Sequence, residues 1–326
     1  MNNISLETLN EWSKLGHRSS FSESLVLLAK ERSDVVVVSP DLTTTARLIN
    51  FEKEFPDRFF NVGIAEQNMI GFTAGLAREG LMPFAVSIAG FAPMRCAEQT
   101  RNMLGYMNLN ARVVGIEAGC RFGPLGNTHF AMDDIGVVRG IPNFTIICPA
   151  DAHEIYKTVF SVAEHNGPVH IRLTGAPGSP LIYPNDFDFK IGKAIEYRPG
   201  RDVAIIATGS VLWEGIRAAD ILEKKGISVR VIDMHTVKPI DVNMLDSVFL
   251  ENKLIVTVEE HSIIGGLGSA VAEYKAGFEN TPRQIMCGLG DSFCKIGNYE
   301  FLLKENGLVG EDIAETVVNS FELSKV

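Results

Sequence analysis

The feature that most restricts the fold is a series of short apolar runs with almost no polar interruption, separated by stretches with helical spacing. In the first half of the chain these runs are residues 35–39, 82–87, 111–117, 144–148 and 168–173. Continuous β-rich runs of this kind are typical of strands that are buried on both faces of a parallel sheet. Their alternation with helices predicts an α/β fold with helices on both faces of the sheet.

Two helix starts carry the pattern of a capping box, in which a polar side chain is followed three residues later by an acid. The pairs are Ser20 with Glu23 and Asp151 with Glu154. Such pairs satisfy free amide groups in the first turn, so we expect helices to begin there.

A Pro- and Gly-rich segment, residues 174–202, interrupts the alternation and predicts a linker. The apolar runs then restart, at residues 202–208, 227–233, 253–260 and 283–289. A chain of 326 residues is long enough for two domains. We therefore expect one domain over residues 1–190, including the start of the linker, and a smaller one over residues 191–326. Each is expected to contain a mainly parallel sheet flanked by helices.

Composition excludes several classes of function. The net charge of −10 disfavours non-specific binding to nucleic acid or to an anionic membrane. No signal peptide and no membrane span is recognisable in the sequence. The five cysteines are scattered without a CxxC pair, which predicts reduced thiols in a cytoplasmic protein and no metal site on this chain.

The segment most informative about chemistry is FFNVGIAEQNMIGFTAGLA, residues 59–77. A strand-like stretch meets a glycine, and Glu66 then opens a helix. From composition alone, Glu66 would be an acid placed in the first helical turn because it interacts favourably with the helix dipole.

This segment closely resembles the glutamate motif in the pyrimidine-binding domain of transketolases and deoxyxylulose-phosphate synthases, which use thiamine diphosphate. Residues 233–241 (DMHTVKPID) and 257–273 (TVEEHSIIGGLGSAVAE) resemble the C-terminal domain of the same family. The resemblance covers nearly the whole chain. It is greatest for the C-terminal, or β, subunit of a split transketolase. It implies a pyrimidine-binding domain followed by a transketolase C-terminal domain.

The resemblance also implies roles for individual residues. Glu66 would hydrogen-bond a ring nitrogen of the cofactor's aminopyrimidine and so favour the tautomer that activates the thiazolium ring. Phe91 aligns with an aromatic residue that stacks on the pyrimidine, and Ile88 stands where a second aromatic is usual. Without the resemblance, Phe91 would equally well be a core residue. His129, in the glycine-rich stretch 119–143, aligns with a histidine that contacts the reacting oxygens of the substrate, a role that suits its titration range.

Three positions depart from the family pattern. Glu117 replaces a second histidine, Leu125 replaces an aspartate that reads a donor hydroxyl, and Gly175 replaces an arginine that holds the sugar phosphate. These departures predict a substrate other than the usual pentose phosphates.

Glu117 itself and four cationic or polar residues are candidates for substrate binding. Arg18 and Thr45 align with phosphate-binding positions of the family, and Arg121 and Arg172 are further cations that could neutralise Glu117.

The family's motif for the diphosphate-bound magnesium ion, a Gly-Asp-Gly segment followed by a downstream asparagine, is absent from this sequence. Magnesium prefers oxygen ligands, which the motif would supply. The resemblance therefore implies that Mg²⁺ is held by an α subunit of about 280 residues, roughly the size of two domains. It also implies an α2β2 complex, with each β subunit inactive alone. The expected reaction is transfer of a two-carbon ketol or acyl unit from a ketose-type donor to an aldehyde acceptor.

Two alternatives stay open at this stage. The β subunit of a 2-oxo acid dehydrogenase shares the fold and the glutamate, although the motifs at 63–68 and 233–241 fit transketolases better. The chain could also be a non-catalytic partner that keeps the fold without the chemistry. The presence of both Glu66 and His129 argues against this second alternative.

Overall fold

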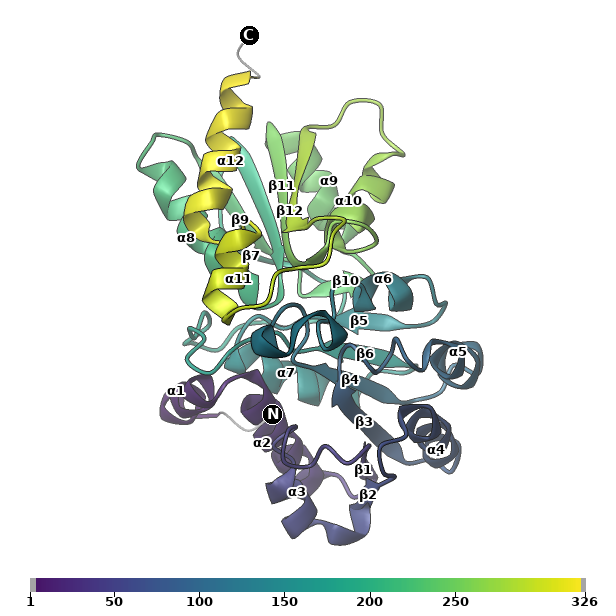
Figure 1. Cartoon of the computed structure of the whole chain (residues 1–326). Coiled ribbons are helices and arrows are strands. Elements are labelled where there is room, and N and C mark those ends of the chain that lie inside the picture. Colours follow the sequence, from purple (N-terminus) through teal and green to yellow (C-terminus); the bar gives the residue numbers. More distant parts are fainter. Residues whose placement is uncertain (1–3, 324–326) are drawn as a thin grey trace.

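The computed structural model describes residues 4–323 and contains two sheets, one built mainly from each half of the chain (Figure 1). The first sheet has seven strands in the order β10-β5-β6-β4-β3-β1-β2, and the second has five in the order β12-β11-β8-β9-β7. All pairings in both sheets are parallel except β10 with β5 and β7 with β9. The expected fold class, two mainly parallel sheets flanked by helices, is confirmed.

Each of the five apolar runs in the first half becomes a strand of the first sheet. Every residue of these five strands is buried, which is why the runs lack polar alternation. The strands of this sheet are β1 (Val35–Ser39), β2 (Phe59–Asn61), β3 (Met82–Ile88), β4 (Arg112–Ile116), β5 (Thr145–Ile147), β6 (Val169–Arg172) and β10 (Thr236–Lys238).

Helices cover both faces of this first sheet (Figure 1). One face packs against α1 (Leu6–Leu15), α2 (His17–Glu31), α3 (Ile49–Glu54) and α7 (Ala152–Ala163). The other packs against α4 (Glu66–Arg78), α5 (Ala97–Gln99), the π-helical turn Thr100–Tyr106 and α6 (Asp134–Arg139). On the first face, the buried rings of Phe21 and Phe84 lie 6.2 Å apart and join α2 to β3.

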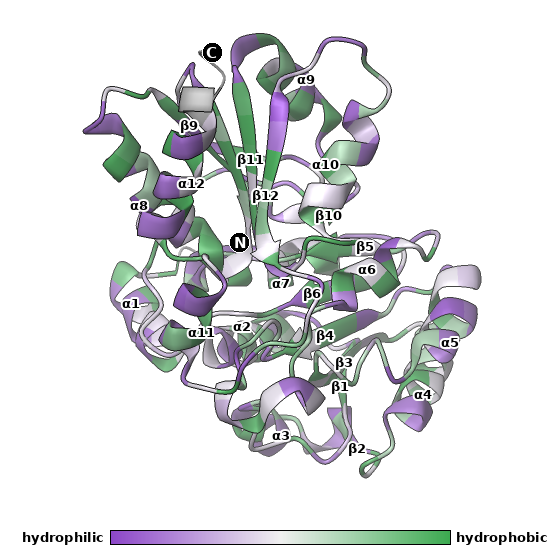
Figure 2. Cartoon of the chain, turned by 45° about the horizontal axis from the view of Figure 1, so that its top comes forward, coloured by the Kyte–Doolittle hydropathy of each residue, from purple (hydrophilic) through white to green (hydrophobic). Residues whose placement is uncertain are grey.

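The second sheet is also covered on both faces, and its central strands are hydrophobic over most of their length (Figure 2). Its strands are β7 (Ile195–Arg198), β8 (Val203–Thr208), β9 (Val229–Asp233), β11 (Leu254–Ser262) and β12 (Arg283–Leu289). The helices α8 (Leu212–Glu223), α11 (Tyr299–Glu305) and α12 (Gly310–Leu323) lie on one face, and α9 (Val242–Glu251) and α10 (Leu267–Lys275) on the other.

One of the two predicted helix starts is confirmed and the other is wrong. Asp151 caps α7 by accepting the amide hydrogen of Glu154 at 2.8 Å. Ser20 instead lies inside α2, which already begins at His17, and its hydroxyl donates to the carbonyl of Gly16. A serine in a helix commonly bonds backward to a carbonyl in this way, which the sequence pattern alone does not reveal.

Two short strands depart from the linker prediction, and one of them ties the two halves of the chain together. Strand β7 lies within residues 174–202 and pairs with β9. Strand β10 comes from the second half of the chain but pairs with β5 in the first sheet. The boundary at residue 190 therefore stays a prediction, since the two halves interlock at this edge.

Among residues 4–323, the structure contains no helix with the length and apolar character that a membrane crossing requires.

Candidate active site

The predicted site residues follow the carboxyl ends of neighbouring strands in the first sheet. Glu66 lies after β2, Phe91 after β3, and Glu117 directly after β4. These strands run parallel, so their carboxyl ends meet at one edge. That edge is where open α/β sheets bind ligands.

Glu66 is the first residue of α4 and its side chain is only 4% exposed. The residue before it, Ala65, offers no side-chain cap, so the carboxylate stands among the free amide groups of the helix start. One carboxylate oxygen accepts a hydrogen bond from Arg95 Nη1 at 2.8 Å. Glu66 therefore differs from an ordinary helix-start carboxylate, because it is buried and paired with a cation.

Arg95 connects Glu66 to Phe91. Its guanidinium carbon lies 4.1 Å from the centre of the Phe91 ring, so the planar cation covers the ring while it donates to Glu66. The Arg95 side chain is 46% exposed, so solvent can reach this place. A planar group with N–H donors thus occupies the space between the carboxylate and the aromatic face.

His129 also contacts Phe91. The two ring centres are 5.4 Å apart, and the His129 ring also meets the edge of Phe122 at 6.0 Å. Its Nδ1 shares a hydrogen bond of 2.9 Å with the Thr128 hydroxyl. The structure therefore brings Glu66, Phe91 and His129 together through a continuous chain of contacts.

Ile88, the last residue of β3, is 6% exposed and belongs to the same apolar cluster against which Phe91 packs. Ile88 has no aromatic ring, and the ring on which Arg95 stacks is that of Phe91. The role of Ile88 in cofactor binding stays a prediction.

Arg18, Thr45, Glu117 and Arg121 form a second group. Glu117 is 3% exposed and lies between two guanidinium groups, with Arg18 Nε at 2.5 Å and Arg121 Nε at 3.7 Å. Thr45 contributes its backbone carbonyl, which accepts a hydrogen bond of 2.7 Å from Arg18. Glu117 also has φ = 55°, a conformation that is uncommon outside glycine and is often found at functional sites.

Arg172 is not part of this group, and its role as a substrate-binding cation stays a prediction. Its side chain is fully buried and donates to both carboxylate oxygens of Asp134 at 2.9 and 3.0 Å. It also donates to two backbone carbonyls, those of Ala131 and Glu260. The Arg172 guanidinium beside Asp134 holds the pKa of that carboxyl well below its usual range despite burial. These contacts engage the Nε and Nη2 atoms of Arg172 in the interior of the domain.

The position that aligns with the family's phosphate-binding arginine is blocked by a neighbouring side chain. A Cβ atom at Gly175 would lie 2.1 Å from His17 Nε2, so no larger residue fits there. The Gly175 amide donates to His17 Nδ1 at 2.9 Å, and burial lowers the pKa of His17 to about 3, which keeps the ring neutral. Leu125, at the other altered position, is 52% exposed on the turn Gly123–Thr128.

The second domain reaches into the same region through Tyr299 and Glu260. The Tyr299 hydroxyl donates to Glu260 at 2.6 Å, and the other carboxylate oxygen of Glu260 accepts the Cys120 amide hydrogen at 2.8 Å. The Arg121 guanidinium lies 5.5 Å from the centre of the Tyr299 ring. Burial raises the pKa of Glu260 to about 7, and burial followed by this carboxyl raises the pKa of Tyr299. The loop that carries His129 is thus fastened to the second domain at its start.

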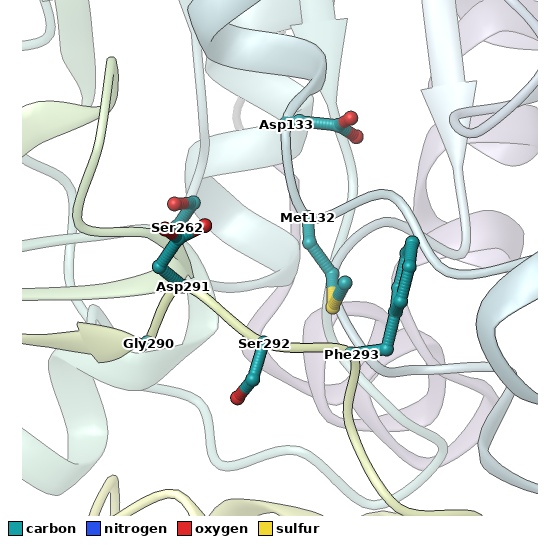
Figure 3. Close-up of a pocket in the computed structure, with 7 residues that line it drawn as sticks. All are labelled: Met132, Asp133, Ser262, Gly290, Asp291, Ser292 and Phe293. Atoms are coloured by element: carbon teal, nitrogen blue, oxygen red, sulfur yellow. The ribbon is translucent and has the colours of Figure 1, made fainter.

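Beside this loop lies a cavity of about 310 Å³, lined by Met132, Asp133, Ser262 and the segment Gly290–Phe293 (Figure 3). It opens between the two domains. Among residues 4–323, no three histidine, cysteine or acidic side chains are grouped closely enough to hold a metal ion.

Sequence reasoning missed three residues that shape the site. Arg95 could have been found, because it follows Phe91 by four residues, the spacing that brings side chains together on a helical turn. His17 and Tyr299 carry no local signal, since their contacts are with residues far away in the chain.

Comparison with known proteins identifies this arrangement. The transketolase pyrimidine-binding domain matches residues 13–176 and the transketolase C-terminal domain matches residues 192–313. The chain therefore belongs to the transketolase family and carries these two of its domains.

Relatives cover almost the same length as this chain. A putative transketolase C-terminal section from Methanocaldococcus jannaschii is 40% identical over 94% of this chain and 96% of its own. One subunit of an apulose-4-phosphate transketolase from Phocaeicola vulgatus is 37% identical over 92% of this chain and 96% of its own. A solved split-gene transketolase, described as an inactive β4 tetramer, superposes with a TM-score of 0.84 at 38% identity, over 94% of this chain and 97% of that one.

Proposed function

We propose that this chain is the β subunit of a split, thiamine-diphosphate-dependent transketolase. It would act with an α subunit to transfer a two-carbon ketol unit from a ketose-type donor to an aldehyde acceptor. The relatives that match it from end to end are themselves a C-terminal section and a single transketolase subunit, which supports a divided enzyme. The cysteine pattern supports a cytoplasmic location.

The observation that carries the proposal is the place occupied by Arg95. A planar group there donates an N–H to a buried carboxylate and lies on an aromatic ring, which are the two contacts that an aminopyrimidine ring needs. Glu66 and Phe91 therefore fit the pyrimidine part of the cofactor. Thiamine diphosphate, when bound, supplies the carbon nucleophile of the reaction.

In this proposal each site residue of the chain has a separate role. Glu66 holds a ring nitrogen of the cofactor and fixes the position of a proton on the ring, while Phe91 orients the ring by stacking. His129, which contacts Phe91, exchanges protons with the substrate oxygens near neutral pH. The Mg²⁺ ion and the diphosphate would be held by the α subunit, since this sequence lacks the motif for them.

The group of Arg18, Glu117 and Arg121 supports an anionic substrate. Two guanidinium groups against one carboxylate leave an excess of positive charge close to His129. One phosphate on a sugar would suit this charge, and the relative from Phocaeicola is described as acting on a phosphorylated sugar. His17 blocks the position where the family usually has an arginine, and the Glu117 carboxylate neutralises part of the positive charge of Arg18 and Arg121. We therefore propose a substrate other than the common pentose phosphates.

Reconstitution tests the proposal. The chain is co-expressed with an α subunit that contains the diphosphate motif, and the complex is screened with ketose phosphates, unphosphorylated ketoses and 2-oxo acids. We expect ketol transfer from a ketose with the complex and none with either subunit alone. Turnover of 2-oxo acids in place of ketoses would instead identify the dehydrogenase type. Absence of turnover with every donor, together with normal cofactor binding, would identify a non-catalytic partner.

A further inference from the structure

Two thiols face each other across the domain boundary, between the loop that carries His129 and the second domain. Cys120 Sγ lies 3.6 Å from Cys294 Sγ, and Cys294 Sγ also lies 3.4 Å from the sulfur of Met132. The two cysteines are 174 residues apart in sequence, so the fold alone brings them together. Of the five cysteines in the chain, all of them free, these two are in contact with one another.

The geometry permits a bond between them. A disulfide needs the sulfurs to be about 2.05 Å apart, so an approach of about 1.5 Å is required. Neither cysteine lies in a helix or strand. Cys120 is in a turn after β4, and Cys294 is in the irregular segment between β12 and α11. Side-chain rotation and a small shift of these segments suffice for such an approach.

The two thiols are not equivalent, which assigns them separate roles. Cys294 is half-buried, whereas Cys120 is 1% exposed. The hydrogen bond from the Cys120 thiol lowers the pKa of Cys294 to about 7, while the pKa of Cys120 is raised, first by this pairing and then by burial. Cys294 is thus the thiol that ionises and reacts first near neutral pH.

A route to Cys294 is present. Met132, which touches the Cys294 sulfur, and Phe293, which precedes it in the chain, both line the cavity between the domains (Figure 3). Phe293 is 82% exposed, so the mouth of the cavity is open. Asp133 and Asp291 also line this cavity, so a small neutral oxidant enters more readily than an anionic disulfide.

We propose that Cys120 and Cys294 form a reversible, peroxide-driven disulfide that fastens the loop carrying His129 to the second domain. The Cys294 thiolate attacks hydrogen peroxide, the O–O bond breaks, and Cys294 becomes a sulfenic acid while hydroxide leaves. The Cys120 sulfur then attacks the Cys294 sulfur, its S–H proton passes to the departing hydroxyl, and water is released. In total, two thiols are oxidised and one peroxide is reduced to two molecules of water.

The proposed disulfide would affect the proposed function because of where Cys120 lies. Cys120 directly precedes Arg121 and lies in the same loop as His129. A covalent link at this point restrains the loop that carries His129. Disulfides of this transient kind are compatible with a reducing compartment, where they act as redox sensors.

Thiol counting on the full chain tests the disulfide without any reference to activity. The folded protein is treated with hydrogen peroxide, blocked with iodoacetamide and measured by mass spectrometry. We expect two of the five thiols to be lost, a cross-linked peptide joining Cys120 to Cys294, and full recovery with dithiothreitol. Retention of all five thiols, or a disulfide between two copies of Cys294, would refute the proposal.

Three variants sharpen the result. Cys294→Ser should leave Cys120 reduced, and Cys120→Ser should drive Cys294 past the sulfenic acid to the sulfinic acid. Cys287→Ser is the matched control, because burial raises the pKa of Cys287 to about 11, and it should keep the cross-link. Loss of the cross-link in Cys287→Ser would contradict the assignment.

The regulatory role rests on the proposed function and has its own readout. In the complex with the α subunit, oxidation should lower turnover and dithiothreitol should restore it, while Cys294→Ser should be insensitive. A fully cross-linked complex with unchanged turnover would refute the regulation. A reduced complex with no turnover would count against the proposed function instead.

Discussion

At the scale of single residues, the central question is whether Glu66 activates a cofactor or only stabilises a helix. Its carboxylate is buried and accepts a hydrogen bond from Arg95, an exposed arginine that is 29 residues away in sequence. A helix-start acid needs neither burial nor such a partner. The geometry therefore fits a carboxyl group that is kept available for a planar ligand.

Substitution of Glu66 by Gln separates the two roles. We expect Glu66→Gln to keep the fold and its association with the α chain but to lose roughly 10² to 10⁴ in turnover, because the amide cannot share a proton with the ring nitrogen. The measurement is steady-state turnover of the complex, together with NMR of the exchange of the cofactor's C2 proton. Glu79→Gln, at the exposed end of the same helix, is the matched control and should be nearly silent. Exchange at the wild-type rate in Glu66→Gln would show that this carboxyl is not the activating group.

Arg95 gives a second prediction at this scale. It uses the same carboxylate and the same ring face that the cofactor is proposed to use, so it has to move before the cofactor binds. Arg95→Ala should therefore tighten thiamine diphosphate binding to the complex by up to roughly fivefold, the effect of an ion pair worth about 1 kcal/mol. Calorimetry of the complex measures this, with Arg101→Ala as the control. Weaker binding in Arg95→Ala would show that Arg95 is a ligand of the cofactor rather than its competitor.

At the scale of elements, the long strands were predictable and the short ones were not. Runs such as 35–39 are buried along their whole length, and burial is what the apolar pattern records. Strand β10 has only three residues, and its position in the first sheet depends on a partner, β5, about 90 residues earlier. Nothing in its local sequence could specify that pairing.

A similar difference runs through the site. Glu66, Phe91 and His129 were predicted from motifs that resemble the transketolase family, and the structure brings them together, while their roles stay predictions. The pairing of Arg172 with Asp134 was not predicted, because the charge of Arg172 is visible in the sequence whereas its partner is not. The contact of Tyr299 with Glu260 likewise depends on how the two domains pack, which no local pattern encodes.

The link between α11 and the loop after β4 predicts a pH dependence. Burial raises the pKa of Glu260 to about 7 from its ordinary 4.5, so between these values the unfolded chain releases a proton that the folded chain keeps. Rising pH in this window therefore favours unfolding, and Glu260→Gln removes the effect while the amide still meets Cys120 and Tyr299. Relative to the wild type, the variant should gain up to roughly 3 kcal/mol of stability between pH 4.5 and pH 8.

Urea unfolding at pH 5 and pH 8 measures this difference. Other titrating groups are common to both proteins and cancel in the comparison. Glu300→Gln, an exposed carboxylate next to Tyr299, serves as the control and should change stability equally at both pH values. If the difference in unfolding free energy between the wild type and Glu260→Gln is the same at both pH values, the buried Glu260 carboxyl is not the cause of the pH dependence.

At the scale of the whole molecule, this chain holds residues for only one end of the proposed cofactor. The pyrimidine contacts are present, but the sequence lacks the diphosphate motif. We therefore expect the isolated chain to bind thiamine diphosphate poorly, and calorimetry should show no submicromolar affinity until the α subunit is added. Submicromolar binding by the chain alone would overturn the divided site.

The molecule also has a face suited to a second copy of itself. Phe72 on α4 and Met103 on the adjacent turn are both more than one-third exposed, and α4 packs on that turn. Tyr106, at 86% exposed, continues the Met103 side of the turn, and Ile64, at 79% exposed, lies two residues before Glu66. Large apolar side chains gathered beside a site are typical of a protein interface.

This face leads to the last prediction, an α2β2 complex that is closed by β–β contacts. Two-fold symmetry makes each change count twice in the interface, so one charge placed at its centre should be disruptive. We expect Tyr106→Glu to convert the complex to a smaller species. Turnover should also be lost, because Ile64 belongs to the proposed interface and lies two residues before Glu66. Light scattering measures the mass. Leu250→Glu, at an equally exposed position on α9 in the second domain, is the matched control and should leave both mass and turnover unchanged. A stable and fully active αβ pair, in the wild type or in Tyr106→Glu, would show that association through this face is not needed for the site.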